Sequence, residues 1–130
     1  MYLLDTNIII FSFRGNKKVN EKISVVGFKN CYISEITIAE LHCGAEKSNN
    51  KAYNINLLNE FLKKVTVIPI KDVIDCFAFE RVRLEKIGNK LDNFDLLIGA
   101  TAIVNNLVLV TNNTKHFDRM SLKSIEDWTN

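Results

Sequence analysis

Short apolar segments alternate along this chain with longer segments in which apolar residues recur at helical spacing. The strand-like segments are residues 2–4, 31–33, 65–70 and 107–110, with one more short strand expected within 121–128. Strands that are separated by helices pair in parallel through right-handed crossovers, and both faces of their sheet are covered. The alternation therefore predicts an α/β fold, a three-layer α/β/α sandwich with a central, mostly parallel sheet.

Turn residues and short polar residues divide the rest of the chain into helices and loops. Ser34, Asp72 and Asp92 stand where a helix would begin, and such side chains can accept hydrogen bonds from free backbone N–H groups. We expect helices over residues 34–47, 55–65, 73–87 and 93–104, and a loop over 48–54. Because no linker interrupts this pattern, residues 1–130 are expected to form a single domain.

Composition excludes several classes of protein. The 130 residues are 47% hydrophobic and 25% charged, which is typical of a globular protein, and the net charge of +2 does not by itself indicate a nucleic-acid binder. The sequence has neither a signal-peptide pattern nor an apolar run of membrane-spanning length, so a cytoplasmic protein without membrane association is expected. Three widely spaced cysteines favour reduced thiols in the core over disulfides or a zinc site.

Acidic and polar residues follow the predicted strands or begin the predicted helices. Asp5 comes directly after the first strand, and Thr111–Asn113 follows the strand at 107–110, so a parallel sheet would bring them to one edge. Glu40 is expected on an inward helix face, where an ionised carboxylate is costly unless it is paired. Asp95 lies in the first turn of a helix whose Gly99 leaves room for close packing.

The inward stripe expected to contain Glu40 is made of Ile36, Ala39, Cys43 and Gly44. A second apolar stripe on the same helix contains Ile38, Leu41 and Ala45. That second stripe either packs under the helix at residues 55–65 or forms a groove for a partner segment.

Taken singly, these acids could be helix caps, partners of a helix dipole or members of salt bridges. Taken together, their oxygen atoms would form a hard anionic pocket suited to Mg²⁺ or Mn²⁺. A divalent ion in such a pocket supports phosphodiester hydrolysis. A zinc hydrolase is not expected, because His42 and His116 lack zinc-binding spacing.

Four motifs, in this order, resemble those of a PIN domain: LLDTN, SEITIAEL, NFDLLIGA and LVLVTNNTKHF. The similarity covers nearly the whole chain and is closest to the VapC ribonuclease toxins. It implies a PIN-like fold and an endoribonuclease, dependent on Mg²⁺ or Mn²⁺, that cuts transfer or messenger RNA in single-stranded or loop regions. It also implies the toxin of a type II toxin–antitoxin pair, a homodimer, and inhibition by a small antitoxin protein.

The resemblance assigns roles to individual residues. Asp5, Glu40 and Asp95 match the acidic catalytic and metal-binding residues of the family. Asn113 stands where the family often has a fourth acid; its amide oxygen can still serve as a ligand, so one metal ion and two remain alternatives. The polar supports implied by the motifs are Asn7, Ser34 and Thr111.

Basic residues surround the segment that contains Asp95. They either bind RNA phosphates or are simply solvated side chains on a helix surface. The candidates for RNA binding are Arg81, Arg83, Lys86, Lys90 and Lys115.

Two other functions are compatible with parts of the pattern. A phosphohydrolase that uses Asp5 as its nucleophile would need a second acid two residues later, but that residue is Asn7. A non-catalytic PIN-like module that binds RNA or protein would be indicated if Asn113 left the acidic set incomplete.

Overall fold

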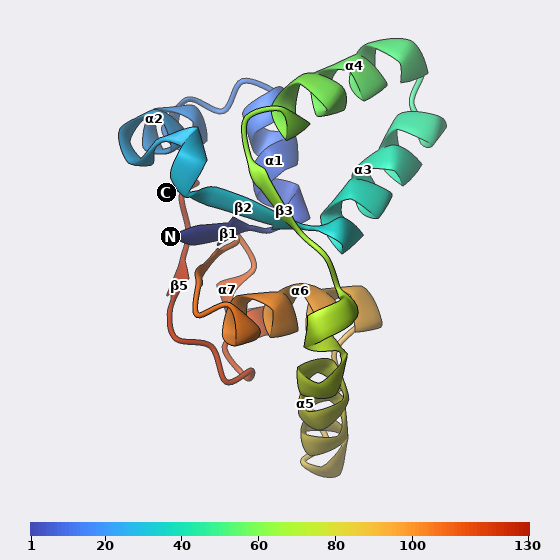
Figure 1. Cartoon of the computed structure of the whole chain (residues 1–130), viewed down its shortest axis with the longest axis vertical. Helices are drawn as coiled ribbons and strands as arrows, with labels where there is room; N and C mark the ends of the chain where they lie inside the picture. Colours follow the sequence, from blue (N-terminus) through green and yellow to red (C-terminus); the bar gives the residue numbers. More distant parts are fainter.

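A five-stranded parallel sheet forms the centre of the computed structural model, which describes all 130 residues (Figure 1). The strand order is β3-β2-β1-β4-β5, and every neighbouring pair is parallel. The strands are β1 (Tyr2–Leu4), β2 (Cys31–Ser34), β3 (Thr66–Ile68), β4 (Val108–Val110) and β5 (Ile125–Glu126). The predicted parallel α/β architecture is therefore confirmed.

Helices cover both faces of this sheet (Figure 1). One layer contains α1 (Thr6–Phe13), α2 (Lys17–Val26), α3 (Glu35–Lys47) and α4 (Lys51–Leu62), and the other contains α5 (Ile74–Lys86), α6 (Asn93–Val104) and α7 (Thr114–Phe117). Two 3₁₀ turns, Phe28–Asn30 and Lys71–Val73, precede β2 and α5. The two ends of the chain meet, since the rings of Tyr2 and Trp128 pack edge to face with their centroids 5.2 Å apart.

Each face of the sheet carries its own apolar core. Because side chains of a strand alternate between the two faces, the neighbouring residues Leu3 and Leu4 are both fully buried yet belong to different cores. Leu4 packs with residues of α1, α2 and α4, and Leu3 packs with residues of α5, α6 and α7. This double burial explains why β1 is apolar throughout.

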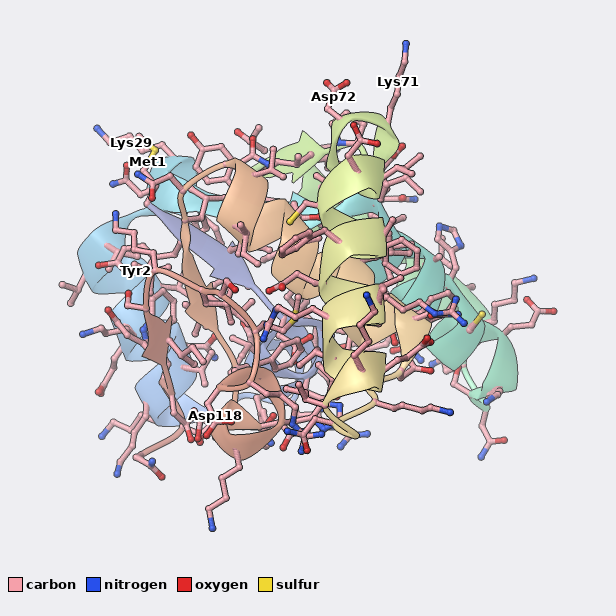
Figure 2. All side chains as sticks on the ribbon, turned by 90° about the horizontal axis from the view of Figure 1, so that it is seen from below. Met1, Tyr2, Lys29, Lys71, Asp72 and Asp118 are labelled. Carbon is pink, nitrogen blue, oxygen red and sulfur yellow. The ribbon has the colours of Figure 1, made fainter.

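Several boundaries differ from those expected. Helix α4 begins at Lys51, inside the predicted loop, because the Asn50 side chain caps it by accepting a hydrogen bond from the Tyr53 backbone N–H. Helices α2 and α7 were not predicted as separate elements. Asp72 is not a side-chain cap of α5: its neighbour Val73 is buried, and Asp72 points outward from the 3₁₀ turn (Figure 2).

The expectation of buried thiols holds for one cysteine in three. Cys31 is buried, Cys76 is half-buried and Cys43 is exposed, and none forms a disulfide. None of the helices combines the length and the apolar composition that crossing a membrane requires.

Two glycines inside helices give opposite predictions for stability. A Cβ atom at Gly99 of α6 would overlap the buried Met120 thioether, whereas a Cβ atom at Gly44 of α3 would meet nothing. We expect Gly99→Ala to lower the free energy of unfolding by about 1–2 kcal/mol, since overpacking outweighs the gain in helix propensity. Gly44→Ala should raise it by roughly 0.5–1 kcal/mol. Urea denaturation of both variants checks the pair, and equal shifts in the same direction would contradict it.

Candidate active site

Asp5 lies at the carboxyl end of β1 and caps α1. Its Oδ1 accepts the Thr6 backbone N–H at 2.9 Å, and its Oδ2 accepts the Thr111 hydroxyl at 2.9 Å. The backbone of Asp5 is itself fixed, because its N–H donates to the carbonyl oxygen of Val110 in β4. The pairing of β1 with β4 thus brings together two residues that are 106 positions apart.

Glu40 of α3 approaches the same region through Thr6. The Thr6 hydroxyl donates to Glu40 Oε1 at 2.6 Å and lies 3.1 Å from the Thr37 hydroxyl. Glu40 is half-buried, but the stripe expected to carry it inward is wrong, because Ala39, Cys43 and Gly44 are exposed. The buried side of α3 is instead formed by Ile36, Thr37, Leu41 and Ala45. Glu40 therefore sits at the edge of the buried face and not in its middle.

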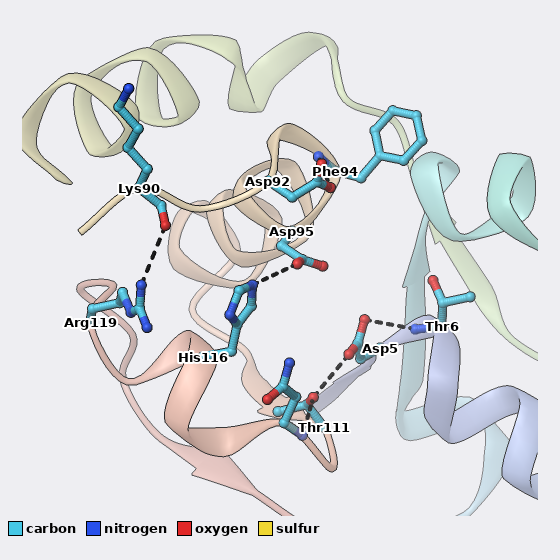
Figure 3. A network of polar contacts seen from close by, with 10 residues as sticks. Asp5, Thr6, Lys90, Asp92, Phe94, Asp95, Thr111, His116 and Arg119 are labelled. Carbon is cyan, nitrogen blue, oxygen red and sulfur yellow. Dashed lines mark hydrogen bonds and ion pairs between the residues drawn. The ribbon is translucent and has the colours of Figure 1, made fainter. Parts of the chain in front are cut away.

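Asp95 reaches the site from the first turn of α6 (Figure 3). Its Oδ2 lies 2.8 Å from Nε2 of His116, which belongs to α7. Asp92, the residue that caps α6, accepts the Phe94 backbone N–H at 3.1 Å, as predicted. The room expected beside Gly99 is filled by Met120.

Burial makes all three carboxyl groups harder to ionise, and the charges of neighbouring acids, Asp92 among them, add to this effect. The pKa of Asp5 is raised from 3.8 to about 6, chiefly by burial and in smaller part by the negative charges of Asp95 and Glu40, against the hydrogen bonds from Thr111 and Thr6. Burial also raises the pKa of Glu40, with a contribution from Asp95. The pKa of Asp95 is raised by burial too, although contact with His116 opposes this. The three acids therefore share one electrostatic environment.

The donor set suits a divalent cation in its chemistry. All three side chains offer hard oxygen atoms, and no Lys or Arg forms an ion pair with any of them. In the present arrangement, however, no three acidic, His or Cys side chains converge closely enough to hold one ion. Asp95 turns toward His116 and Glu40 toward Thr6, so joint binding of an ion would require these side chains to rotate.

The predicted polar supports divide into those that reach the acids and those that do not. Thr111 is fully buried and binds Asp5, and the backbone N–H of Asn113 donates to the Thr111 hydroxyl at 3.0 Å. Ser34 is used locally, as the cap of α3, and accepts the Ile36 backbone N–H. The side chains of Asn7 and Asn113 are exposed and contact none of the acids.

The predicted RNA-binding residues divide in a similar way. Arg81 is ion-paired with Glu85 at 2.9 Å, and Arg83 with the buried Glu80 at 2.7 Å. Both guanidinium groups therefore already have an acidic partner within α5. The exposed side chains of Lys86, Lys90 and Lys115 form no ion pair.

Two residues of the site were missed by sequence reasoning. Thr6 could have been suspected, since it follows Asp5 within the LLDTN motif. His116 lies within the motif LVLVTNNTKHF, but nothing in the sequence links it to Asp95, which is 21 positions away; only the packing of α7 beside α6 brings the two together. The sequence pattern had set His116 aside only as a zinc ligand.

The sequence model of the PIN domain family matches residues 2–123 of this chain. Ribonuclease VapC2 of Rickettsia felis is 35% identical, and the tRNA(fMet)-specific endonuclease VapC of Shigella flexneri is 32% identical; in both cases 98% of each chain is covered. The structure is similar to that of VapBC2 from Rickettsia felis bound to a promoter DNA fragment, with a TM-score of 0.91, 32% identity and 98% of each chain covered. The protein therefore belongs to the PIN domain family, among the VapC ribonucleases.

Proposed function

We propose that Asp5, Glu40 and Asp95 hold Mg²⁺ or Mn²⁺ and that this protein, the toxin of a toxin–antitoxin pair, uses the ion to hydrolyse RNA in the cytoplasm. The observation that carries the proposal is a set of three carboxylates that lack a Lys or Arg partner and whose pKa values are raised, chiefly by burial and in smaller part by repulsion from neighbouring acids. A divalent cation would remove this repulsion. When bound, it supplies positive charge for the scissile phosphate and lowers the pKa of water.

The residues around the acids hold Asp5 in place and bind Glu40 and Asp95 when no ion is present. Thr111 and the Thr6 backbone N–H hold the two oxygens of Asp5, so this side chain is oriented before any ion arrives. The Thr6 hydroxyl holds Glu40 in the ion-free arrangement, and Glu40 would turn away from it to share an ion. His116 holds Asp95 in the ion-free arrangement and lowers its pKa against the effect of burial, and Asp95 would also turn to share an ion. We propose that loop or single-stranded regions of transfer or messenger RNA are the substrate.

The two alternative functions fit the site less well. An aspartyl-phosphate mechanism needs an acid near Asp5 that protonates the leaving group, but Asn7 is exposed and makes no contact with Asp5. A binding-only module would not require three acids to be kept together at a cost in stability. Their retention favours catalysis.

We further propose that an antitoxin segment binds the groove between α1, α3 and α4. This groove has a volume of about 320 Å³ and reaches Glu40 at one end. The solved relatives include VapBC complexes, such as VapBC-1 of Haemophilus influenzae, which is 33% identical with a TM-score of 0.86. The groove is lined by Ile10, Phe13, Arg14, Glu40, Leu41, Gly44, Ala45, Ser48, Tyr53, Asn54, Leu57 and Leu58.

The second apolar stripe of α3 therefore has both expected roles in part. Leu41 and Ala45 are buried against neighbouring helices, yet both also line the groove.

The expected homodimer has separate support on α5, where Phe79 and Val82, one turn apart, are exposed.

Substitution of Asp5 tests the catalytic proposal. In the presence of Mn²⁺, the wild-type protein should cleave a labelled single-stranded RNA, and Asp5→Asn should lower the rate by at least about 100-fold because a ligand of the ion is lost. Asp75→Asn, an equivalent change at an exposed site on α5, should leave the rate unchanged. Equal cleavage by the wild-type and Asp5→Asn proteins would favour the binding-only module.

The same variant tests the electrostatic cost of the site. The folded pKa of Asp5 lies above its ordinary value, so the folded state binds more protons between pH 4 and 6, and the free energy of unfolding should fall as pH rises through this interval. At pH 7.5 without metal, Asp5→Asn should be more stable than wild type by roughly 2–3 kcal/mol. Its amide can still accept from Thr6 and donate to Thr111.

Addition of Mn²⁺ should reverse this order. Millimolar Mn²⁺ should raise the melting temperature of the wild-type protein and have little effect on Asp5→Asn, because an ion that binds only the folded state stabilises it. Thermal unfolding at pH 5 and 7.5, with and without Mn²⁺, measures both effects. If Mn²⁺ shifted the two proteins equally, Asp5 would not be a ligand.

The groove proposal predicts a local change in hydrogen exchange. Binding of the antitoxin should slow amide exchange in α4 and in the part of α3 around Leu41 and Ala45, with no change in α5, which lies on the opposite layer. Exchange monitored by mass spectrometry resolves these segments. Unchanged exchange in α3 and α4 would exclude this groove.

A further inference from the structure

Arg119 occupies a turn that follows α7 and faces the candidate active site. It lies three residues after His116, and the helical turn continues past α7, since the Asp118 N–H donates to Thr114 and the Met120 N–H to Phe117. Residues three apart in a helical turn lie on the same side. Figure 3 shows Arg119, His116, Asp95 and Asp5 following one another across the site.

The guanidinium group of Arg119 is held in place but is not neutralised. One of its amino groups donates to the Lys90 carbonyl oxygen at 3.3 Å, and no carboxylate lies within ion-pair distance. Arg119 thus differs from Arg81 and Arg83, which both have acidic partners. Its remaining N–H donors are free to form paired hydrogen bonds, the geometry in which arginine recognises phosphate.

A buried ion pair fixes the backbone on which Arg119 stands. Glu80 is only 1% exposed, and it accepts the Arg83 Nε–H at 2.7 Å and the Ser121 backbone N–H at 2.7 Å. Arg83 also donates to the carbonyl oxygen of Arg119 at 2.9 Å. Helix α5 therefore holds the chain at Arg119 itself and again two residues later.

This ion pair is not required for packing alone. Apolar residues of similar volume often stabilise a core as well as a buried salt bridge does, whereas directed hydrogen bonds set the position of a backbone segment. The hydrogen bonds of Glu80 and Arg83 end on the turn that carries Arg119. They fix the backbone on both sides of Met120, and the Arg119 guanidinium group in turn contacts the Lys90 carbonyl oxygen.

We propose that Arg119 binds a backbone phosphate of the RNA next to the scissile bond, and that Glu80 and Arg83 position it. This inference rests on the proposed ribonuclease function and names a contact through which the site holds its substrate. It reassigns Arg83 from direct phosphate binding to a supporting role. Lys90, whose carbonyl oxygen accepts from Arg119, has no acidic partner and is a second candidate for phosphate contact.

The test measures RNA binding without cleavage. Each substitution is made in the Asp5→Asn protein, and the dissociation constant of a labelled single-stranded oligoribonucleotide is measured over a series of salt concentrations. Arg119→Gln should weaken binding about tenfold and make the dependence of log Kd on log salt shallower by about one unit, because one phosphate contact is lost. Arg81→Gln, which removes the same charge from an ion-paired site, should change Kd less than about twofold.

A third substitution tests positioning separately from charge. Arg83→Lys retains a cation beside Glu80 but cannot also reach the carbonyl oxygen of Arg119. Binding should weaken about threefold with the salt dependence unchanged. Circular dichroism and the melting temperature of each variant show whether it has folded.

The possible outcomes separate this inference from the proposed function. Unchanged affinity and salt dependence in Arg119→Gln, with RNA still bound by the parent, overturn only the role of Arg119. Equal weakening by Arg119→Gln and Arg81→Gln overturns it too, because general charge would then account for both. Absence of RNA binding by the parent, together with no cleavage by the wild-type protein, overturns both proposals.

Discussion

The parallel pairing of β1 with β4 is the constraint on which the site depends. It places the carboxyl ends of two strands that are far apart in the sequence side by side, so that Thr111 donates to Asp5. Because β1 is also paired with β2, the helix that carries Glu40 starts from the same edge of the sheet. The site is therefore a consequence of strand order, and the apolar cores on both faces hold that order in place.

The buried acids lower the free energy of unfolding of the fold that contains them when no cation is bound. Asp5 is buried near two other carboxylates, and its raised pKa is the direct sign of that cost. Two threonines and a histidine orient the acids, but none of them supplies a permanent positive charge. Under the proposed function, binding of a divalent cation would lower this cost and so link the folding energetics of the chain to its activity.

The sequence was more informative about the roles of the acidic residues than about those of the arginines. Asp5 and Asp95 could be chosen as candidates because the end of a parallel strand and the start of a helix are defined by local patterns, and the charge of Asp95 does act on Asp5. Local patterns did not show that Arg81 and Arg83 are each already paired with an acid. Their partners Glu80 and Glu85 are recognised only when burial and side-chain direction are known. Arg119 was overlooked for the same reason, since nothing near it in the sequence marks its contacts.

The sequence by itself determined the parallel α/β architecture, the apolar strands and the family, because these follow from local periodicity, capping residues and four ordered motifs. It also singled out Asp5, Glu40 and Asp95 as the candidate site. The tertiary structure alone decided which side of α3 is buried, that Thr6 and His116 contact the acids, and which arginines are already paired. These features depend on distances between side chains from separate elements, and such distances exist only once the two cores have packed.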